Sequence, residues 1–330
     1  MSLAVSGNYY GAGSGTDGYV GKFIPEIWSG KLQVKFYSTT VLSDITNNDW
    51  EGEIKDQGDK VLIRTVPTIT INDYQKGQSL SNQVPSADKI ELLIDKGKYF
   101  SLVVDDVDDI QSDLKLMDIF TNDASQQMKI TVDTQVLAGL VGAAASTNRG
   151  NAAGVVSGDL NLGQSIDDAT AGEQRDARKI TTANVLDYVL RMGQALDEQN
   201  VPEDGRWLVI PTWMSALIKQ SDLKQAYLTG DSMSPLRNGK IGMIDRFTVY
   251  VSNLLPTINA MPGEGGDTSV KGYSVFAGTR DAITFASQIT KMETLRSTAT
   301  FGNIVRGLNV YGYKVTKPEA LVEGFFYKGT

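Results

Sequence analysis

Apolar residues along this chain follow the two-residue period of strands in some segments and the period of about 3.6 residues of helices in others. Residues 61–71 and 89–104 are β-branched or alternating runs, and the polar stretch 72–88 separates them. This arrangement predicts a long two-stranded β-ribbon with a polar tip at residues 73–87. An isolated pair of strands is marginal in water, so we expect another part of the protein, or a neighbour, to cover the ribbon.

A long helix is predicted directly after the ribbon. Residues 112–145 contain no proline and would form a helix of roughly thirty residues, about 45 Å long. A spacing of four residues moves the apolar seam around the helix by about 40° per step. The seam consists of Leu116, Phe120, Ala124, Met128, Val132, Val136 and Leu140. We therefore expect this helix to contact different partners along its length.

The N-terminal region predicts one further helix and a glycine-rich arm. Residues 25–38 fit a helix, because Pro25 suits a first turn and apolar residues recur every four positions. Residues 1–22 carry too little apolar surface to fold alone, so composition favours a disordered tail. The amphipathic side chains Tyr9, Tyr10 and Tyr19 favour the alternative that the arm anchors on a neighbouring subunit.

Strands and helices alternate after a glycine-rich boundary segment, residues 146–179. A helix with a threonine cap is predicted over residues 181–200, followed by a buried strand over 206–210 that Pro211 ends, and a helix over 212–220. Later apolar runs, at residues 247–256, 273–289 and 307–326, predict further strands. The fold class is therefore α+β in several lobes.

Composition excludes several classes of enzyme. The chain of 330 residues has no histidine and no cysteine, which removes structural zinc, thiol nucleophiles and imidazole bases. The net charge of -8 argues against a protein that grips nucleic acid through its phosphates. The chain lacks a signal peptide at its start and any run of about eighteen apolar residues, so we expect a soluble protein made in the cytoplasm.

Six aspartates crowd residues 102–118 and include Asp105, Asp106, Asp108 and Asp109. Hard cations prefer carboxylate oxygens, so one hypothesis is a magnesium-dependent phosphotransferase. The alternative is an acidic turn before the long helix, whose N-terminus favours negative charge. The stretch GAGSGTDG lacks the lysine and the preceding strand of a phosphate-binding loop. We therefore expect no metal, no cofactor and no catalytic residue.

The order of these elements resembles that of the major capsid proteins of tailed phages, which have the Hong Kong 97-like fold. Local segments resemble the same family, in the family's order, over about residues 23–323. They are IPEIWSGKL, EGEIKDQGDKVLIRTVP, IDKGKYFSLVVDDVD, EDGRWLVIPTWMSALI, RNGKIGMIDRFTVYVSNLLP and GLNVYGYKVTKPEALV.

The resemblance implies an N-terminal arm and helix over residues 1–48, an extended loop over 49–104, a peripheral domain from 105–147 and 283–330, and an axial domain over 148–282. It implies a structural protein, not an enzyme, that self-assembles from hexamers and pentamers into an icosahedral virion shell around double-stranded phage DNA. The implied partners are other copies of the chain, scaffolding and portal proteins, and a decoration protein as a further candidate. DNA is expected to be contacted weakly and without sequence specificity, and no membrane is expected.

A shell protein needs segments that fold against its neighbours, and the arm and the ribbon tip are of this kind. We expect the intersubunit contacts at Tyr9, Tyr10, Tyr19, Tyr74, Lys76, Leu80 and Val84. The ribbon residues Lys76, Lys89, Lys96 and Lys98 are either solvated charges that prevent aggregation or, as in some relatives, sites of isopeptide cross-links. The alternative function is the shell of an encapsulin-like nanocompartment that encloses an enzyme.

Overall fold

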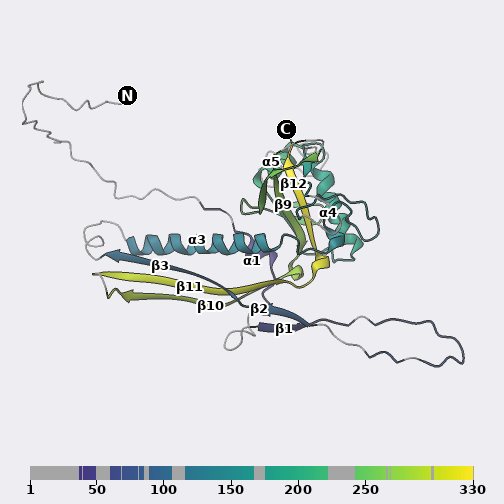
Figure 1. The fold of residues 1–330 in the computed structure, drawn as a ribbon, viewed down its shortest axis with the longest axis horizontal. Coiled ribbons are helices and arrows are strands. Elements are labelled where there is room, and N and C mark those ends of the chain that lie inside the picture. The colour runs from purple at the N-terminus through teal and green to yellow at the C-terminus, as the bar shows by residue number, and fades with distance from the viewer. Residues whose placement is uncertain are drawn as a thin grey trace, which may run out of the picture.

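The computed structural model describes residues 37–38, 40–49, 60–67, 69–80, 82–84, 89–105, 116–166, 175–221, 242–264, 267, 269–298 and 301–329. The chain forms an elongated sheet with one long helix along it, a compact lobe at one end of that sheet, and a projecting hairpin (Figure 1). The α+β fold class predicted from the sequence is confirmed.

The hairpin is the predicted ribbon, but its regular part is short. β1 (Lys60–Arg64) and β2 (Lys89–Leu93) pair antiparallel over five residues each. The residues between them that the structure describes form no strand. The prediction of a strand over residues 61–71 was therefore wrong beyond Arg64. Alternation makes a strand possible, but a strand also needs a partner for its backbone hydrogen bonds.

The run predicted as a single strand over residues 89–104 is divided between two sheets. β2 ends at Leu93, and after two residues the chain continues as β3 (Lys96–Asp105). β3 pairs with β11 and not with β1. The prediction that both strands of the ribbon are long was wrong, because a second sheet supplies the hydrogen-bond partners of β3.

The elongated sheet has three antiparallel strands in the order β10-β11-β3. β10 (Ile283–Arg296) and β11 (Gly302–Val315) form a long hairpin, and a register shift between Ser287 and Ile289 interrupts their pairing. In Figure 1, α3 runs along this sheet over much of its length.

The long helix α3 (Leu116–Gly139) has 24 residues, so it is about 36 Å long. The prediction over residues 112–145 was too long at its C-terminal end, where two glycines weaken the helix and the chain turns at Gly142 with φ +73°. Residues 106–115 lie outside the described part. Among the described side chains of the predicted seam, Val132, Val136 and Leu140 are buried, whereas Phe120 is 42% exposed. The buried residues contact different partners, as predicted: Val132 and Val136 pack with Tyr311, and Leu140 packs with Trp207.

The compact lobe is built on a mixed sheet of seven strands in the order β4-β12-β9-β5-β7-β6, with β8 paired to β9. Its strands are β4 (Arg178–Ile180), β5 (Arg206–Ile210), β6 (Met243–Ile244), β7 (Phe247–Val251), β8 (Thr257–Met261), β9 (Val270–Thr279) and β12 (Leu321–Lys328). Two helices, α4 (Val185–Glu198) and α5 (Thr212–Gln220), pack on it and share its apolar core.

The sequence predictions for this lobe were mostly accurate. β5 is buried at all five positions, and α5 follows Pro211 directly, so both predictions are confirmed. The predicted threonine cap of α4 was wrong. The cap position is Asn184, whose Oδ1 accepts hydrogen bonds from the backbone and the hydroxyl of Thr181 at 2.7 and 3.1 Å. Thr181 is thus held by the turn before the helix and does not cap it.

The N-terminal helix predicted over residues 25–38 falls largely outside the described part. Tyr37 and Ser38, which are described, are not helical. A short helix follows them, α1 (Leu42–Ile45), which the sequence analysis did not predict. Tyr9, Tyr10 and Tyr19 also lie outside the described residues.

One apolar cluster joins the elongated sheet to the compact lobe. Leu137 and Leu140 at the end of α3 pack with Trp207 of β5 and with residues where the chain crosses between the lobes, such as Ile283 and Leu321. The sequence analysis placed residues 283–330 with the long helix, but β12 pairs with β9 in the compact lobe. The last strand of this segment therefore lies in the lobe that the prediction assigned to residues 148–282.

Candidate interaction surfaces

The base of the hairpin is anchored on one face and exposed on the other. Its inner face contributes Leu92, Ile94 and the partly buried Val61 to a small apolar cluster with Ala286 of β10. The outer face carries exposed leucines, Leu62 and Leu93, among charged residues. Among the described residues of the hairpin, the apolar contacts that fix it to its own subunit lie at its base.

Beyond the base, the loop of residues 65–84 is held by a few polar contacts. The side-chain amide of Gln83 bonds both backbone groups of Thr70, donating to its oxygen at 2.8 Å and accepting from its nitrogen at 3.1 Å. A tight turn at the tip places Gly77 at φ +87°, with the nitrogen of Gln78 donating to the oxygen of Gln75. These contacts connect the two limbs of the loop without burying any apolar side chain.

The apolar side chains of this loop are strongly exposed. Tyr74, Leu80 and Val84 of the predicted contact set all lie on the surface, Val84 with 92% of its area accessible, and Lys76 is exposed beside them. The structure brings these four residues to one loop but forms no cluster from them. Three further exposed residues were missed by the sequence analysis: Val66, Ile69 and Ile71. The sequence analysis assigned these residues to a strand of the ribbon because the run that contains them is β-branched and alternating. The same alternation could have indicated that they form an exposed apolar surface.

A second apolar surface lies on the three-stranded sheet. Tyr311 faces α3 with Val132 and Val136, and alternate residues of a strand point to opposite faces. Leu308 and its cross-strand neighbour Tyr99 therefore point away from α3, and both are exposed. A hollow of about 480 Å³ lies here.

The charges in this hollow are paired with one another. Glu293 lies between the Nζ of Lys291 at 2.6 Å and the Nη2 of Arg306 at 3.4 Å. The hydrogen bond and charge of Lys291, with the charge of Arg306, hold the pKa of Glu293 below its usual range. Because these side chains are exposed, the network is worth little to stability but defines a polar centre in an otherwise apolar face.

The ribbon lysines do not share one environment. The Nζ of Lys96 is 2.9 Å from Asp95 and 5.0 Å from the centre of the Tyr313 ring. Its hydrogen bond lowers the pKa of Asp95. Lys76 and Lys89 are exposed. The choice between solvated charges and cross-linking residues therefore stays a prediction for all four lysines, of which Lys96 makes contacts within its own subunit.

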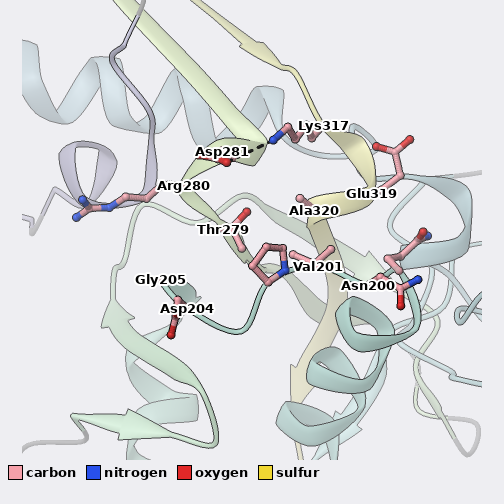
Figure 2. Close-up of a pocket in the computed structure, with 12 residues that line it drawn as sticks. Asn200, Val201, Asp204, Gly205, Thr279, Arg280, Asp281, Lys317, Glu319 and Ala320 are labelled. Carbon is pink, nitrogen blue, oxygen red and sulfur yellow. Dashed lines mark hydrogen bonds and ion pairs between the residues drawn. The ribbon is translucent and has the colours of Figure 1, made fainter. Parts of the chain in front are cut away.

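A cleft of about 340 Å³ lies where the two lobes meet (Figure 2). The turn between α4 and β5 forms one wall, and the two chain crossings between the lobes form the others. The guanidinium of Arg206 fixes the turn by donating to the oxygens of Val201 and Pro202 at 2.6 and 2.9 Å. Lys317 and Asp281 pair beside the cleft at 3.3 Å. Charges that are paired in this way are typical of a structural junction.

Two buried carboxylates stabilise the same junction. Asp133 on α3 accepts a hydrogen bond from the backbone nitrogen of Val41 at 2.7 Å. Glu323 on β12 accepts one from the nitrogen of Gly142 at 2.7 Å and one from the hydroxyl of Ser274 at 3.2 Å. Burial raises the pKa of both carboxyl groups, although these hydrogen bonds act in the opposite direction. Asp133 therefore connects α3 to the chain before α1, and Glu323 connects β12 to the turn that follows α3.

Most of the aspartate run lies outside the described residues. Asp105 ends β3, whereas Asp106, Asp108 and Asp109 lie outside the described residues. Within the described ranges, acidic side chains form no group of three suited to a metal ion. Over the same ranges, the helices are too short or too polar to cross a membrane.

Comparison with known proteins identifies related chains. A family model described as phage capsid protein matches residues 89–324. A structure from Mycobacterium phage Che8 is 26% identical with a TM-score of 0.71, and the match covers 91% of this chain and 96% of that one. No curated protein sequence matches the chain.

Two further structures share the fold at lower identity. The capsid structure of the cyanophage P-SCSP1u is 15% identical with a TM-score of 0.66, over 94% of each chain. The capsid of a native GTA particle, computed with C5 symmetry, is 12% identical with a TM-score of 0.57, over 96% of this chain and 99% of that one.

Proposed function

The chain belongs to the phage capsid protein family, and we propose from its exposed surfaces how copies of it are joined. It is a major capsid protein with the Hong Kong 97-like fold, a structural component of the icosahedral virion shell and not an enzyme. Its partners in that shell are other copies of itself. The question that remains is which of its surfaces make those contacts.

The observation that carries the proposal is the loop of residues 65–84. It presents Val66, Ile69, Ile71, Tyr74, Leu80 and Val84 to solvent. Fully burying one such side chain stabilises a protein by about 1.5–3 kcal/mol, and this loop buries none within its own subunit. A neighbouring subunit that covers the loop would bury these side chains, and the same stabilising contact would recur at every repeat of the lattice. We therefore assign Tyr74, Lys76, Leu80 and Val84 to an intersubunit contact.

The N-terminal arm is proposed to make a second contact. Tyr9, Tyr10 and Tyr19 occur in a glycine-rich segment that has little other apolar surface. Tyrosine is enriched at interfaces because it combines a large apolar ring with a polar tip. The arm and the loop would then extend from one subunit to different neighbours.

Ring symmetry and lobe assignment follow as parts of the same proposal. The native GTA particle capsid was computed with C5 symmetry, and we expect copies of this chain to form pentamers and hexamers. The compact lobe would be the axial domain around these axes. The elongated sheet with α3 would be the peripheral domain. The extended loop, predicted over residues 49–104, would end before β3, because β3 is a strand of the elongated sheet. Because β12 pairs with β9 of the compact lobe, we assign β12 to the axial domain.

Scaffolding and portal proteins, and a decoration protein, are proposed as further partners on the strength of the family alone. Packaged DNA would be contacted weakly, because a net charge of -8 leaves little cationic surface for phosphates. Low affinity suits a shell in which DNA has to move during packing.

The test is assembly of the purified chain in the absence of other phage proteins. Electron microscopy of the wild-type chain should show closed particles of uniform size. A variant with Tyr74→Ser, Leu80→Ser and Val84→Ser should keep the helix content and the cooperative melt of the wild type, because none of these side chains is buried. It should form particles at less than a tenth of the wild-type yield.

The matched control is Met243→Ser, which removes an exposed apolar side chain of the compact lobe and should not change the yield. Closed particles of the triple variant at wild-type yield would show that the loop is not an intersubunit contact.

A further inference from the structure

The boundary segment after α3 contains a small loop with the sequence GVVSG, residues 154–158, that the structure describes throughout. Its neck is closed by Ala153 and Leu160, each of which donates a backbone hydrogen bond to the other at 2.9 Å. Both neck side chains are buried in the main core of the compact lobe. The loop is therefore anchored at its base like a short hairpin.

The tip of this loop is held by a carboxylate from α4. The Oε2 of Glu198 accepts hydrogen bonds from the backbone nitrogens of Val156 and Ser157 at 2.8 and 3.1 Å. Gln194, one turn earlier, donates to the other oxygen of Glu198 at 2.9 Å. Desolvation acts to raise the pKa of Glu198, but these hydrogen bonds outweigh it and lower the pKa to about 2. The carboxylate is thus charged and committed to the loop throughout the neutral range.

The backbone of the loop admits only glycine at its first position. Gly154 has φ +100°, and a Cβ there would lie 2.2 Å from the Ser157 hydroxyl and 2.9 Å from Glu198 Oε2. Gly158 also has a positive φ. Backbone conformation, neck pairing and the carboxylate therefore all define one shape for the loop.

This rigid shape presents apolar side chains to solvent. Val155 is 52% and Val156 is 82% exposed. Leu190 is also exposed and lies on α4 at the i, i+4, i+8 spacing with Gln194 and Glu198, which places these three residues along one side of the helix. The loop tip and this side of α4 together form a surface that we call the α4 flank.

The charges beside the α4 flank are already satisfied within the subunit. Asp187 pairs with Arg191 at 2.8 Å, and Arg191 lies 5.2 Å from the ring of Tyr188. The carboxylate of Glu198 accepts hydrogen bonds from the backbone of the loop. The flank is therefore a preorganised surface of exposed apolar side chains beside the charged carboxylate of Glu198, which suits a protein partner and not a polyanion.

We propose that the α4 flank is a preformed contact for a neighbouring copy of this chain, packed against the compact lobe of the next subunit in a ring. This inference rests on the proposed function. The 65–84 loop projects from the end of the hairpin and not from the compact lobe (Figure 1), so lateral contacts between compact lobes need a surface of their own. A ring of identical copies is held together by heterologous contacts between its subunits. A loop that is ordered before binding loses little entropy when the contact forms.

The test uses the absence of cysteine from the chain. Val156→Cys introduces a single thiol, and its rate of reaction with a maleimide is compared between free subunits and particles assembled from the purified chain. We expect the rate to fall at least tenfold on assembly. Met243→Cys, at another exposed apolar position of the compact lobe, provides the reference rate. Equal rates at position 156 in subunits and particles would overturn the proposal.

A second variant tests the contact through its energetics. Val155→Ser with Val156→Ser should retain the wild-type melt, because both side chains are exposed and serine adds no charge beside Glu198, and should reduce particle yield at least tenfold. Met243→Ser should leave the yield unchanged. Wild-type yield from the double serine variant would also overturn the proposal while leaving the proposed function intact. A wild-type chain that forms no particles would instead contradict the proposed function, and this inference with it.

Discussion

Asp133 accepts a hydrogen bond from a residue far away in the sequence, and no local pattern of residues predicts this contact. It lies in the second half of α3 and is almost fully buried, yet its carboxylate accepts the backbone nitrogen of Val41, which immediately precedes α1. The first backbone nitrogens of a helix have no partner within the helix. Asp133 therefore serves α1 in the way that a capping residue would, but from another element, and fixes the entering chain against α3.

Removing this carboxylate should be costly. Asp133→Ala leaves a buried backbone nitrogen without its acceptor, so we expect the free energy of unfolding to fall by about 2 kcal/mol. Urea unfolding followed by circular dichroism measures this. The control is Asp123→Ala on the same helix, where the bond from Tyr37 to the carboxylate is exposed, so the loss should stay below about 1 kcal/mol. Equal losses in the two variants would contradict the assigned role.

Glu323 predicts a dependence of stability on pH. Burial raises its pKa in the folded state, against the hydrogen bonds of Ser165, Gly142 and Ser274 and the charge of Arg149. The stability that it contributes is therefore fully present below the pKa of the unfolded chain, about 4.3, and is lost as pH rises through the folded-state pKa. Each tenfold difference in proton affinity corresponds to about 1.4 kcal/mol.

Glu323→Gln isolates this effect, because the amide keeps the shape but does not titrate. The unfolding free energy of the wild type minus that of the variant should decrease as pH rises from 4.5 to 8, because the wild type loses stability as Glu323 ionises. Urea unfolding at several pH values measures it, and the contribution of Asp133, whose pKa is also raised, cancels in the comparison. A difference that is constant with pH, or that grows with rising pH, would show that Glu323 is not buried as described.

At the scale of elements, the hairpin base and β11 approach each other unusually closely. A Cβ on Gly312 of β11 would lie 2.0 Å from the backbone oxygen of Leu93, where β2 ends. The atom it would meet belongs to the backbone, which cannot move aside as a flexible side chain can. Glycine at this position therefore allows the chain to pass from the ribbon into β3 directly over β11.

Gly312→Ala should consequently destabilise the subunit by about 1–3 kcal/mol, the usual cost of overpacking. Gly97→Ala is the matched control in the same sheet, because its Cβ would meet only a methyl group of Val310 at 3.9 Å. We expect the control to unfold at nearly the wild-type urea concentration. A Gly312→Ala variant as stable as the control would mean that the two strands do not approach this closely in solution.

At the scale of the whole molecule, the subunit has well-packed parts and parts whose apolar groups face solvent. The compact lobe and the second half of α3 are buried, whereas the 65–84 loop and the α4 flank are exposed. Such a subunit gains stability when it assembles, because binding to the folded state shifts its unfolding equilibrium.

The N-terminal arm provides a prediction at this scale. If Tyr9, Tyr10 and Tyr19 anchor on a neighbour, limited proteolysis should cut before Phe23 at least tenfold faster in free subunits than in particles. Mass spectrometry of the fragments over time measures the ratio. An arm that is cut equally fast in both states would be a tail and not a contact.

Much of the local structure followed from the pattern of residues alone. The strand β5, in which four of the five residues are apolar, is closed by Pro211 and followed by α5. Both elements were predicted with their observed bounds, because each signal there acts within a few residues. The exposure of Tyr74, Leu80 and Val84 was predicted for a similar reason, since a polar stretch rich in glycine and serine provides no core for them. The absence of histidine and cysteine excluded many enzymes without any structure.

Only the tertiary structure decided how the elements combine. Residues 89–104 alternate throughout, but a break at Ile94 and Asp95 sends β2 and β3 to different sheets, and a period of two does not specify a partner. The apolar seam of α3 is regular, yet among its described side chains burial begins at Val132, where Leu42 of α1 and Tyr311 of β11 cover the helix. The compact lobe covers Leu137 and Leu140 at its end. The pairing of Glu198 with the GVVSG loop joins residues about forty positions apart. Periodicity reports which side of an element is apolar, whereas hydrogen bonds and packing between distant segments decide what that side meets.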